Sequence, residues 1–133
     1  MMEKLKRESI WLNWRLETRG GKTTKIPYQR DDRFASSTDS KTWCTFDEAK
    51  NVKNFSGVGI VFEPSQGVVG VDFDHCVLET GIPKHILSFL DASNTYCEYS
   101  PSKTGFHVLF ILKEDVELES HKHYFDETSH VEV

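Results

Sequence analysis

The run Val68-Val-Gly-Val-Asp72-Phe-Asp74 constrains the fold more than any other segment of the chain. Its β-branched residues predict a buried strand in the core of a sheet. Residues two apart in a strand face the same side, so Asp72 and Asp74 are expected to project together from the end of this strand. Two like charges so placed raise each other's proton affinity unless a cation neutralises them.

A divalent cation is the simplest way to neutralise this pair. Mg²⁺ and Mn²⁺ take oxygen ligands, and a pair of such ions can hold both the attacking and the leaving oxygen of a phosphoryl transfer. Asp72 and Asp74 are therefore candidate metal ligands, and Mg²⁺ or Mn²⁺ is the expected cofactor. The alternative is that Asp74 only ends the strand and caps the turn at His75 and Cys76.

The segment Ser100-Pro-Ser-Lys-Thr-Gly-Phe-His107 is the second candidate feature. It combines three hydroxyl groups, a lysine and a glycine in one turn and places His107 at the start of a predicted strand. Backbone N–H groups, hydroxyls and an ammonium group in such a turn can bind phosphate, and a histidine can donate to a phosphate oxygen. Turns of this composition are common, so the segment gains weight only beside the aspartates.

Three further features are weaker. Glu132, in the terminal HVEV, would complete a three-carboxylate site if its strand neighbours the aspartate strand, although a solvated glutamate is the default interpretation. His121 and His123 have a spacing that could bind a metal on a strand, but their charged surroundings favour an exposed loop. Trp11 and Trp14 could stack on bases, while packing in the core or hairpin is the favoured role.

The remaining pattern predicts short strands and helices in the order β-β-α-β-β-α-β-β. Strands are expected at 10–16 and 24–28, joined by the Gly20-Gly21 turn, at 57–63 and 67–74 as a hairpin, and at 95–99 and 106–112. Helices are expected from the capping box at Thr45 to about residue 52, and over 82–90. Residues 29–42 are expected to form an exposed loop and residues 114–129 a loop with a little helix, and a last strand begins at HVEV. This order indicates an α+β fold, a largely antiparallel sheet with flanking helices, in a single domain over 1–133.

Length and composition fit an ordinary globular protein. The chain has 133 residues, and none of its apolar runs approaches the roughly 20 residues that a membrane-spanning helix needs. The charged N-terminus lacks a signal-peptide pattern, so we expect a cytoplasmic protein with no membrane partner. Three cysteines at irregular spacing, Cys44, Cys76 and Cys97, favour reduced thiols over a disulfide framework or a zinc site.

The distribution of charge is uneven. A net charge of −5 argues against tight nucleic-acid binding, because phosphate contacts favour a basic surface. Residues 1–50, however, carry 11 Lys and Arg against 8 Asp and Glu, whereas residues 51–133 carry 5 against 13. The excess of acidic residues in 51–133 is what we expect of a region that binds divalent metal ions.

Taken in order, the segments WLNWRLE, KTTKIPY, ASSTDSKTWCTFDEA, GVGIVF, GVVGVDFDHC and YSPSKTGFHVLF resemble the N-terminal domain of phage and plasmid primase-polymerases. These proteins belong to the archaeo-eukaryotic primase superfamily, and the resemblance covers roughly residues 10–133. It implies an RRM-like catalytic core and a DNA primase or polymerase activity that adds nucleotides from NTPs or dNTPs in the replication of a phage or plasmid in a bacterial cell. The implied partners are a nucleoside triphosphate, a single-stranded DNA template, and a helicase domain or replication protein.

The resemblance also implies roles for individual residues. Asp72 and Asp74 match the metal-binding aspartates, and Glu132 is the best match for a later acid of the same catalytic and metal-binding set. Gly105 and His107 match a motif in which the histidine is catalytic and contacts the incoming triphosphate. The implied nucleotide-binding set is Lys25, Ser102, Lys103, Thr104, Gly105 and His107.

Two departures from the family pattern matter. The family often has glycine where this chain has Lys103, which makes the turn less permissive but adds charge. Family members also continue past the HVEV strand into a basic-aromatic strand and a threonine-glycine turn, so we expect a domain that is incomplete at its C-terminal end. Whether these residues alone form an active enzyme stays open.

Three alternatives remain. The chain could be a truncated or degenerate primase domain that binds a nucleotide or a replication partner without catalysis. The DxD pattern also occurs in sugar-nucleotide glycosyltransferases, but that class does not explain the SPSKTGFH turn. A phosphatase with an aspartyl nucleophile would need a lysine and paired acids downstream, and the chain does not supply them.

Overall fold

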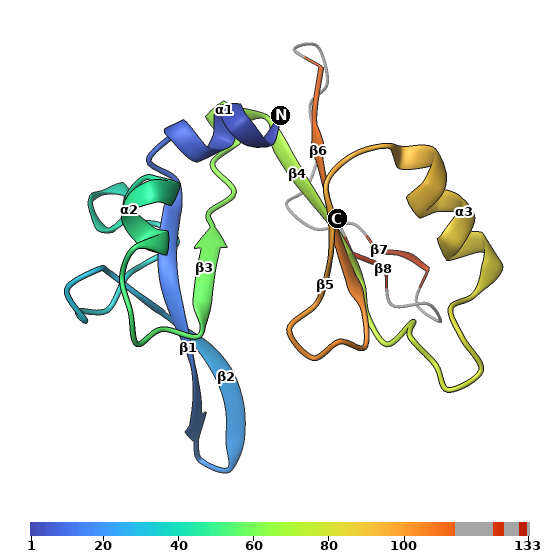
Figure 1. The fold of residues 1–133 in the computed structure, drawn as a ribbon, viewed down its shortest axis with the longest axis horizontal. Helices are drawn as coiled ribbons and strands as arrows, with labels where there is room; N and C mark the ends of the chain where they lie inside the picture. The colour runs from blue at the N-terminus through green and yellow to red at the C-terminus, as the bar shows by residue number, and fades with distance from the viewer. Residues whose placement is uncertain (114–123, 127–130, 133) are drawn as a thin grey trace. The chain divides into compact units, whose positions relative to one another are not determined.

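The chain forms two compact units, Met1–Glu63 and Pro64–Val133 (Figure 1). The computed structural model describes residues 1–113, 124–126 and 131–132. Within these residues each unit contains one antiparallel sheet. The first has the order β2 (Lys22–Tyr28), β1 (Trp11–Arg19), β3 (Gly57–Ile60), and the second has the order β5 (Cys97–Tyr99), β6 (Phe106–Ile111), β4 (Val68–Phe73), β8 (Val131–Glu132), β7 (Tyr124–Asp126). The predicted α+β class is confirmed, but with two small sheets in place of one. A single primase-polymerase-like domain over 1–133 stays a prediction.

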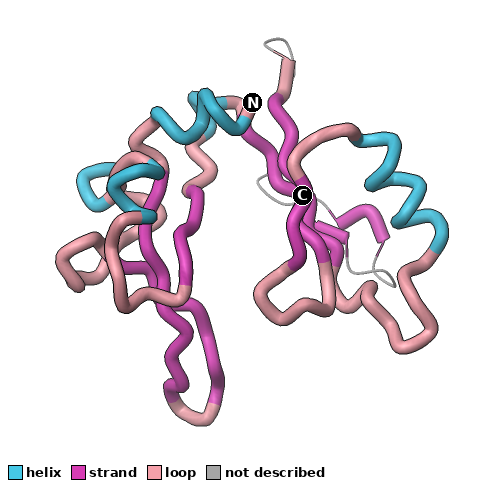
Figure 2. The backbone as a smooth tube through the Cα atoms, in the orientation of Figure 1, coloured by secondary structure: helices cyan, strands magenta, loops and turns pink. Residues whose placement is uncertain are grey.

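The first unit is built around a long hairpin. Its elements are α1 (Met2–Arg7), β1 (Trp11–Arg19), β2 (Lys22–Tyr28), α2 (Phe46–Lys50) and β3 (Gly57–Ile60) (Figure 2). Gly20 and Gly21 join β1 to β2 with φ of 59° and 78°, the left-handed conformation that a two-residue hairpin turn requires. The predicted hairpin is therefore confirmed, whereas α1 was not predicted.

The tryptophans of β1 are used for packing. The buried Trp11 ring meets Phe46 edge-on, and its indole Nε1 donates to the Leu5 carbonyl oxygen at 2.8 Å. Trp14 Nε1 donates to the Val58 carbonyl oxygen at 2.9 Å. The favoured interpretation of these residues, packing in the core and hairpin, is confirmed. The capping box at Thr45 is also present and starts α2.

The second unit places one helix against its sheet. Its elements are β4 (Val68–Phe73), α3 (Lys84–Ser93), β5 (Cys97–Tyr99), β6 (Phe106–Ile111), β7 (Tyr124–Asp126) and β8 (Val131–Glu132). Ile86 of α3 shares a buried cluster with Val71 and Phe73 of β4 and with Val108 of β6. Because side chains alternate along a strand, the opposite face of the sheet is left for the residues between these.

The predicted hairpin between 57–63 and 67–74 is wrong. β3 pairs with β1, where Trp11 lies opposite Ile60, and β4 pairs along its full length with β6, where Val71 lies opposite Val108. The turn at Pro64–Gln66 connects the two units rather than two neighbouring strands. A short apolar run carries no information about its partner strand, so a linker between sheets and a hairpin turn look alike in the sequence.

The other predicted elements differ mainly at their ends. The second predicted helix is confirmed but begins after Pro83 and continues to Ser93. The predicted loop over 114–129 is wrong at Tyr124–Asp126, which pairs with β8; the rest of that segment, including His121 and His123, lies outside the described residues. Within the described part of the chain, none of the helices is long and apolar enough to cross a membrane.

Candidate functional site

A row of acidic residues and a histidine crosses the second sheet. Glu98 of β5 lies opposite His107 of β6, His107 opposite Asp72 of β4, and Asp72 opposite Glu132 of β8. Directly opposed residues of antiparallel strands share a face of the sheet. This face is the one opposite α3, because Val71 and Phe73 on either side of Asp72 pack in the helix-side cluster. We call these four positions the acid–histidine row.

His107 is held between two carboxylates. Its Nδ1 lies 3.1 Å from Glu98 Oε1, and its Nε2 lies 3.8 Å from Asp72 Oδ1. The Tyr96 hydroxyl donates to the other oxygen of Glu98 at 2.6 Å. Burial raises the pKa of Tyr96 to about 12, and the hydrogen bond to Glu98 adds to that rise, so this hydroxyl stays a donor at neutral pH.

Glu98 and Tyr96 were not identified from the sequence. The segment TYCEYS has no motif that marks a functional acid. The length of the turn between the two strands does contain this information. If residues 100–105 form the turn, Tyr99 pairs with Phe106, and Glu98 must then lie opposite His107. The pairing was missed because the residue types of the two strands leave the register of that hairpin open.

The two aspartates occupy the same end of β4. Asp72 lies within the strand, and its Oδ1 is shielded from solvent. Asp74 is the first residue after the strand, is exposed, and precedes His75, whose φ of 49° starts a turn. Burial raises the pKa of the neighbouring Cys76 thiol, and the carboxylates of Asp72 and Asp74 add to that rise, so the thiol stays protonated beside them.

The predicted metal site is supported by the pairing of β4 with β8, but not by a cluster of described side chains that could bind a metal ion. The strand of Glu132 does neighbour that of Asp72, which is the condition set by the sequence. Among the described side chains, however, no group of three or more His, Cys, Asp or Glu is arranged to hold a metal ion. For Glu132 the structure gives only its place in β8. The expected Mg²⁺ or Mn²⁺ therefore stays a prediction.

The structure explains why position 105 is a glycine. A Cβ atom at this position would lie 2.1 Å from the Phe73 carbonyl oxygen, far inside van der Waals contact, and 3.3 Å from the Asp74 Cα. Only glycine lets the start of β6 come this close to the end of β4. That approach fixes His107, two residues further on, opposite Asp72.

The turn between β5 and β6 is shaped by its own hydroxyl groups. The buried Ser100 accepts from the Gly105 N–H at 3.1 Å, and Ser102 Oγ lies 3.0 Å from Ser100 Oγ and 2.7 Å from Thr104 Oγ1. Lys103 is exposed and has a φ of 62°, a conformation that favours glycine. These hydroxyls would have to exchange partners to bind a phosphate, and the nucleotide contacts of Ser102, Lys103 and Thr104 stay predictions.

Lys25 belongs to the first unit, whereas the other candidates belong to the second. It lies on the exposed part of β2, and its ammonium group is 5.2 Å from the centroid of the Trp14 ring. This cation–π contact gives Lys25 a structural role within the hairpin. The nucleotide contact of Lys25 stays a prediction.

No protein-family model matches the chain, and no curated protein is significantly similar to it. The resemblance to primase-polymerases therefore rests on the sequence motifs quoted above and stays a prediction.

Proposed function

We propose that the chain is a nucleotidyltransferase domain of the primase-polymerase type. In this reaction a 3′-hydroxyl attacks the α-phosphate of a bound NTP or dNTP on a single-stranded DNA template, and pyrophosphate leaves. The observation that supports this best is the acid–histidine row. It brings together Asp72, His107 and Glu132, which are far apart in the sequence and are each predicted from local patterns as site residues.

The donor set suits hard divalent cations. Asp72, Asp74 and Glu132 offer carboxylate oxygens, the ligands that Mg²⁺ and Mn²⁺ prefer, and a bound ion would stabilise negative charge on the phosphoryl oxygens. In this proposal His107 donates a hydrogen bond to the triphosphate. In this family of reactions the protein supplies geometry and electrostatics rather than a covalent nucleophile.

Glu98 acts on this site through His107. A carboxylate that accepts from Nδ1–H fixes the tautomer and the ring orientation of a histidine. At a separation of 3.1 Å, Glu98 directs the Nε2 side of the ring toward Asp72. Tyr96 holds the other Glu98 oxygen in place. Glu98 and Tyr96 are thus positioning residues in this proposal.

Extension of a labelled primer on a DNA template tests the proposal, with Mg²⁺ or Mn²⁺ and both NTPs and dNTPs. Asp72→Asn keeps the size of the side chain but removes its charge, and we expect it to lower activity by about a hundredfold or more. Asp91→Asn on α3 is the matched control, because Asp91 is exposed on a helix that packs against the other face. Activity that survives in a folded Asp72→Asn protein would exclude the mechanism.

The second candidate is a module that binds a nucleotide or a replication partner without catalysis. It is favoured by the described side chains, among which no group of three or more His, Cys, Asp or Glu is arranged to hold the metal ions that catalysis needs. Calorimetry with Mn²⁺ and dATP separates the two candidates. Nucleotide binding that requires Asp72 and Asp74, in a protein that extends no primer, would support the binding module.

A further inference from the structure

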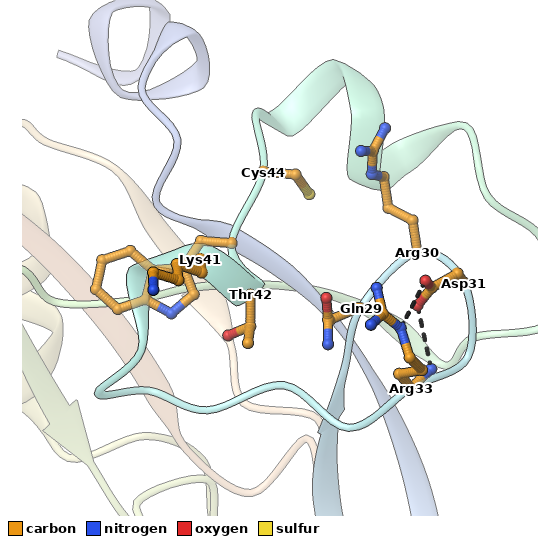
Figure 3. A pocket seen from close by; sticks show the side chains of 8 residues that line it. Gln29, Arg30, Asp31, Arg33, Lys41, Thr42 and Cys44 are labelled. Atoms are coloured by element: carbon orange, nitrogen blue, oxygen red, sulfur yellow. Dashed lines mark hydrogen bonds and ion pairs between the residues drawn. The ribbon is translucent and has the colours of Figure 1, made fainter.

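A basic pocket lies in the first unit, between the loop that follows β2 and the segment that leads into α2 (Figure 3). We call it the β2–α2 pocket. It is open to solvent and has a volume of about 240 Å³. Its lining residues are Gln29, Arg30, Asp31, Arg33, Lys41, Thr42, Trp43 and Cys44.

Both walls of the pocket are fixed by hydrogen bonds. In the first wall the Gln29 N–H donates to the Arg33 carbonyl oxygen at 2.7 Å, which closes a tight turn. In the second wall Cys44 exchanges two backbone hydrogen bonds with Trp11 of β1, at 2.8 and 2.9 Å. Trp43 Nε1 donates to the Ser36 carbonyl oxygen at 2.7 Å. The pocket is therefore a preformed feature of the unit rather than a chance approach of two loose loops.

Positive charge exceeds negative charge in this pocket. Arg33 pairs with Asp31 at 2.7 Å, and Arg30 pairs with Glu48 at 3.0 Å. Each guanidinium carries five N–H donors, so one carboxylate partner leaves donors for a ligand. Within the described part of the chain, the Lys41 ammonium group has no ion pair. Burial raises the pKa of the Cys44 thiol, so this residue adds no negative charge.

An exposed aromatic ring belongs to the same loop as Arg30 and Arg33. Phe34 directly follows Arg33, and 62 % of its surface is exposed. Its ring lies 5.2 Å from that of Tyr28, and the Arg19 guanidinium lies 5.5 Å from its centroid. Cations that contact phosphate beside an aromatic ring that stacks on a base are the usual means of binding single strands without sequence preference.

We propose that the β2–α2 pocket binds a phosphate group through Arg30, Arg33 and Lys41, with Phe34 stacking on the attached base. The ligand is the phosphate of a single-stranded nucleic acid or of a free mononucleotide, which offer the same chemistry. The proposal is independent of nucleotidyl transfer, because none of these residues belongs to the acid–histidine row.

Fluorescence anisotropy of the whole chain with a labelled oligo-dT of about 12 nucleotides tests this site. A chelator in the buffer prevents any metal-dependent binding by Asp72 and Asp74 from contributing. The pocket variant is Arg33→Gln with Lys41→Gln. The matched control is Lys22→Gln with Lys53→Gln, which removes two exposed cations of the same unit outside the pocket lining.

We expect the pocket variant to bind about tenfold more weakly and to lose about 1.4 from the slope of log affinity against log salt, at about 0.7 for each phosphate contact. The control should stay within about twofold of the parent protein at moderate salt. Equal losses in both variants would mean that binding follows net charge alone, and that outcome overturns the proposal. Failure of the parent protein to bind either oligo-dT or dTMP overturns it as well.

Competition distinguishes the two sources of phosphate. If a strand is the ligand, unlabelled oligo-dT displaces the probe at far lower nucleotide concentration than dTMP does. If a mononucleotide is the ligand, dTMP competes equally well for each nucleotide added. Either result supports the pocket when amide NMR signals of residues 29–33 and 41–44 shift on binding, and shifts confined to other residues contradict it.

Discussion

The two units are built alike, each with an antiparallel sheet and short helices, but they carry net charges of opposite sign. The first carries 12 Lys and Arg against 9 Asp and Glu, whereas the second carries 4 against 12. In the first, Arg30, Asp31, Arg33 and Lys41 line a pocket between loops; in the second, Asp72 and Glu98 lie on strands, on either side of His107 across one face of the sheet. The net charge of the chain therefore describes neither unit, and an argument from charge has to be made for each unit separately.

The largest expected effect is a loss of stability in the second unit alone, caused by a substitution at Gly105. Gly105→Ala would place a Cβ 2.1 Å from the Phe73 carbonyl oxygen, and backbone atoms on both sides cannot yield cheaply. We expect a loss of about 3 kcal/mol or more in the unfolding free energy of the second unit. All three tryptophans lie in the first unit, so their fluorescence reports on that unit, while amide NMR signals report on the second.

Gly59→Ala is the control for this experiment. Its Cβ would come no closer than 3.4 Å to the side chains of Leu12 and Trp14, so a small change is expected. An unfolding free energy of the second unit that is unchanged in Gly105→Ala would show that β4 and β6 can separate, and would remove the reason given for this glycine.

The next largest effect is on activity and comes from a substitution in the acid–histidine row. Glu98→Gln keeps the shape of the side chain but weakens its hold on His107 Nδ1, and we expect primer extension to fall by about 10- to 100-fold. The ¹⁵N shifts of the imidazole give a readout that a purely structural role would not move, since they report the tautomer. Glu98→Asp should recover part of the activity, and Glu79→Gln, an exposed acid elsewhere in the unit, should keep it.

High pH offers a matched comparison of the two units. The pKa of Tyr96 is raised to about 12 by burial and by Glu98, and that of Tyr28 in the first unit is raised by its hydrogen bond to Glu17. An unfolded tyrosine loses its proton near 10, so the stabilisation from Tyr96 is complete below pH 10 and is lost as pH rises from 10 to about 12.

Urea unfolding at pH 8, 9, 10 and 11 measures this dependence. Tyr96→Phe should flatten the loss of stability in the second unit only, and Tyr28→Phe in the first only. A pH dependence unchanged by Tyr96→Phe would mean that its hydroxyl does not sense Glu98.

The smallest effect lies at the tip of the β5–β6 turn. Lys103 adopts a φ of 62°, so Lys103→Gly should relieve backbone strain and stabilise the second unit by about 0.5–1 kcal/mol after the entropy of the unfolded glycine is counted. Lys103→Ala removes the charge but keeps the Cβ, and is expected to bring no gain. Equal stabilisation by both variants would trace the effect to charge instead.

Features coded by neighbouring residues could be predicted from the sequence. The capping box at Thr45, the Gly20-Gly21 turn and the strand that contains Asp72 all appear as predicted, because each depends on contacts within a few residues. The pairing of β3 and β4 could not be predicted, because partner strands are chosen by the packing of the whole sheet.

The candidate site divides in the same way. Asp72, His107 and Glu132 could be proposed because their motifs are local, whereas their position opposite one another is seen only in the sheet. Glu98 was missed because its importance lies entirely in the residue opposite it. The basic pocket was missed for a similar reason, since its two walls come from separate segments of a predicted loop.

The order of strands also bears on how each sheet avoids joining with another chain. The open edges of a sheet can template unwanted strand addition. In the second sheet β5 forms an edge and is only three residues long, which offers few unpaired backbone groups. In the first, the longer edge strand β2 carries Lys22, Lys25 and Pro27, residues that discourage a further strand by charge and by a missing N–H group. The hairpin lysines thus also help to keep the protein from aggregating.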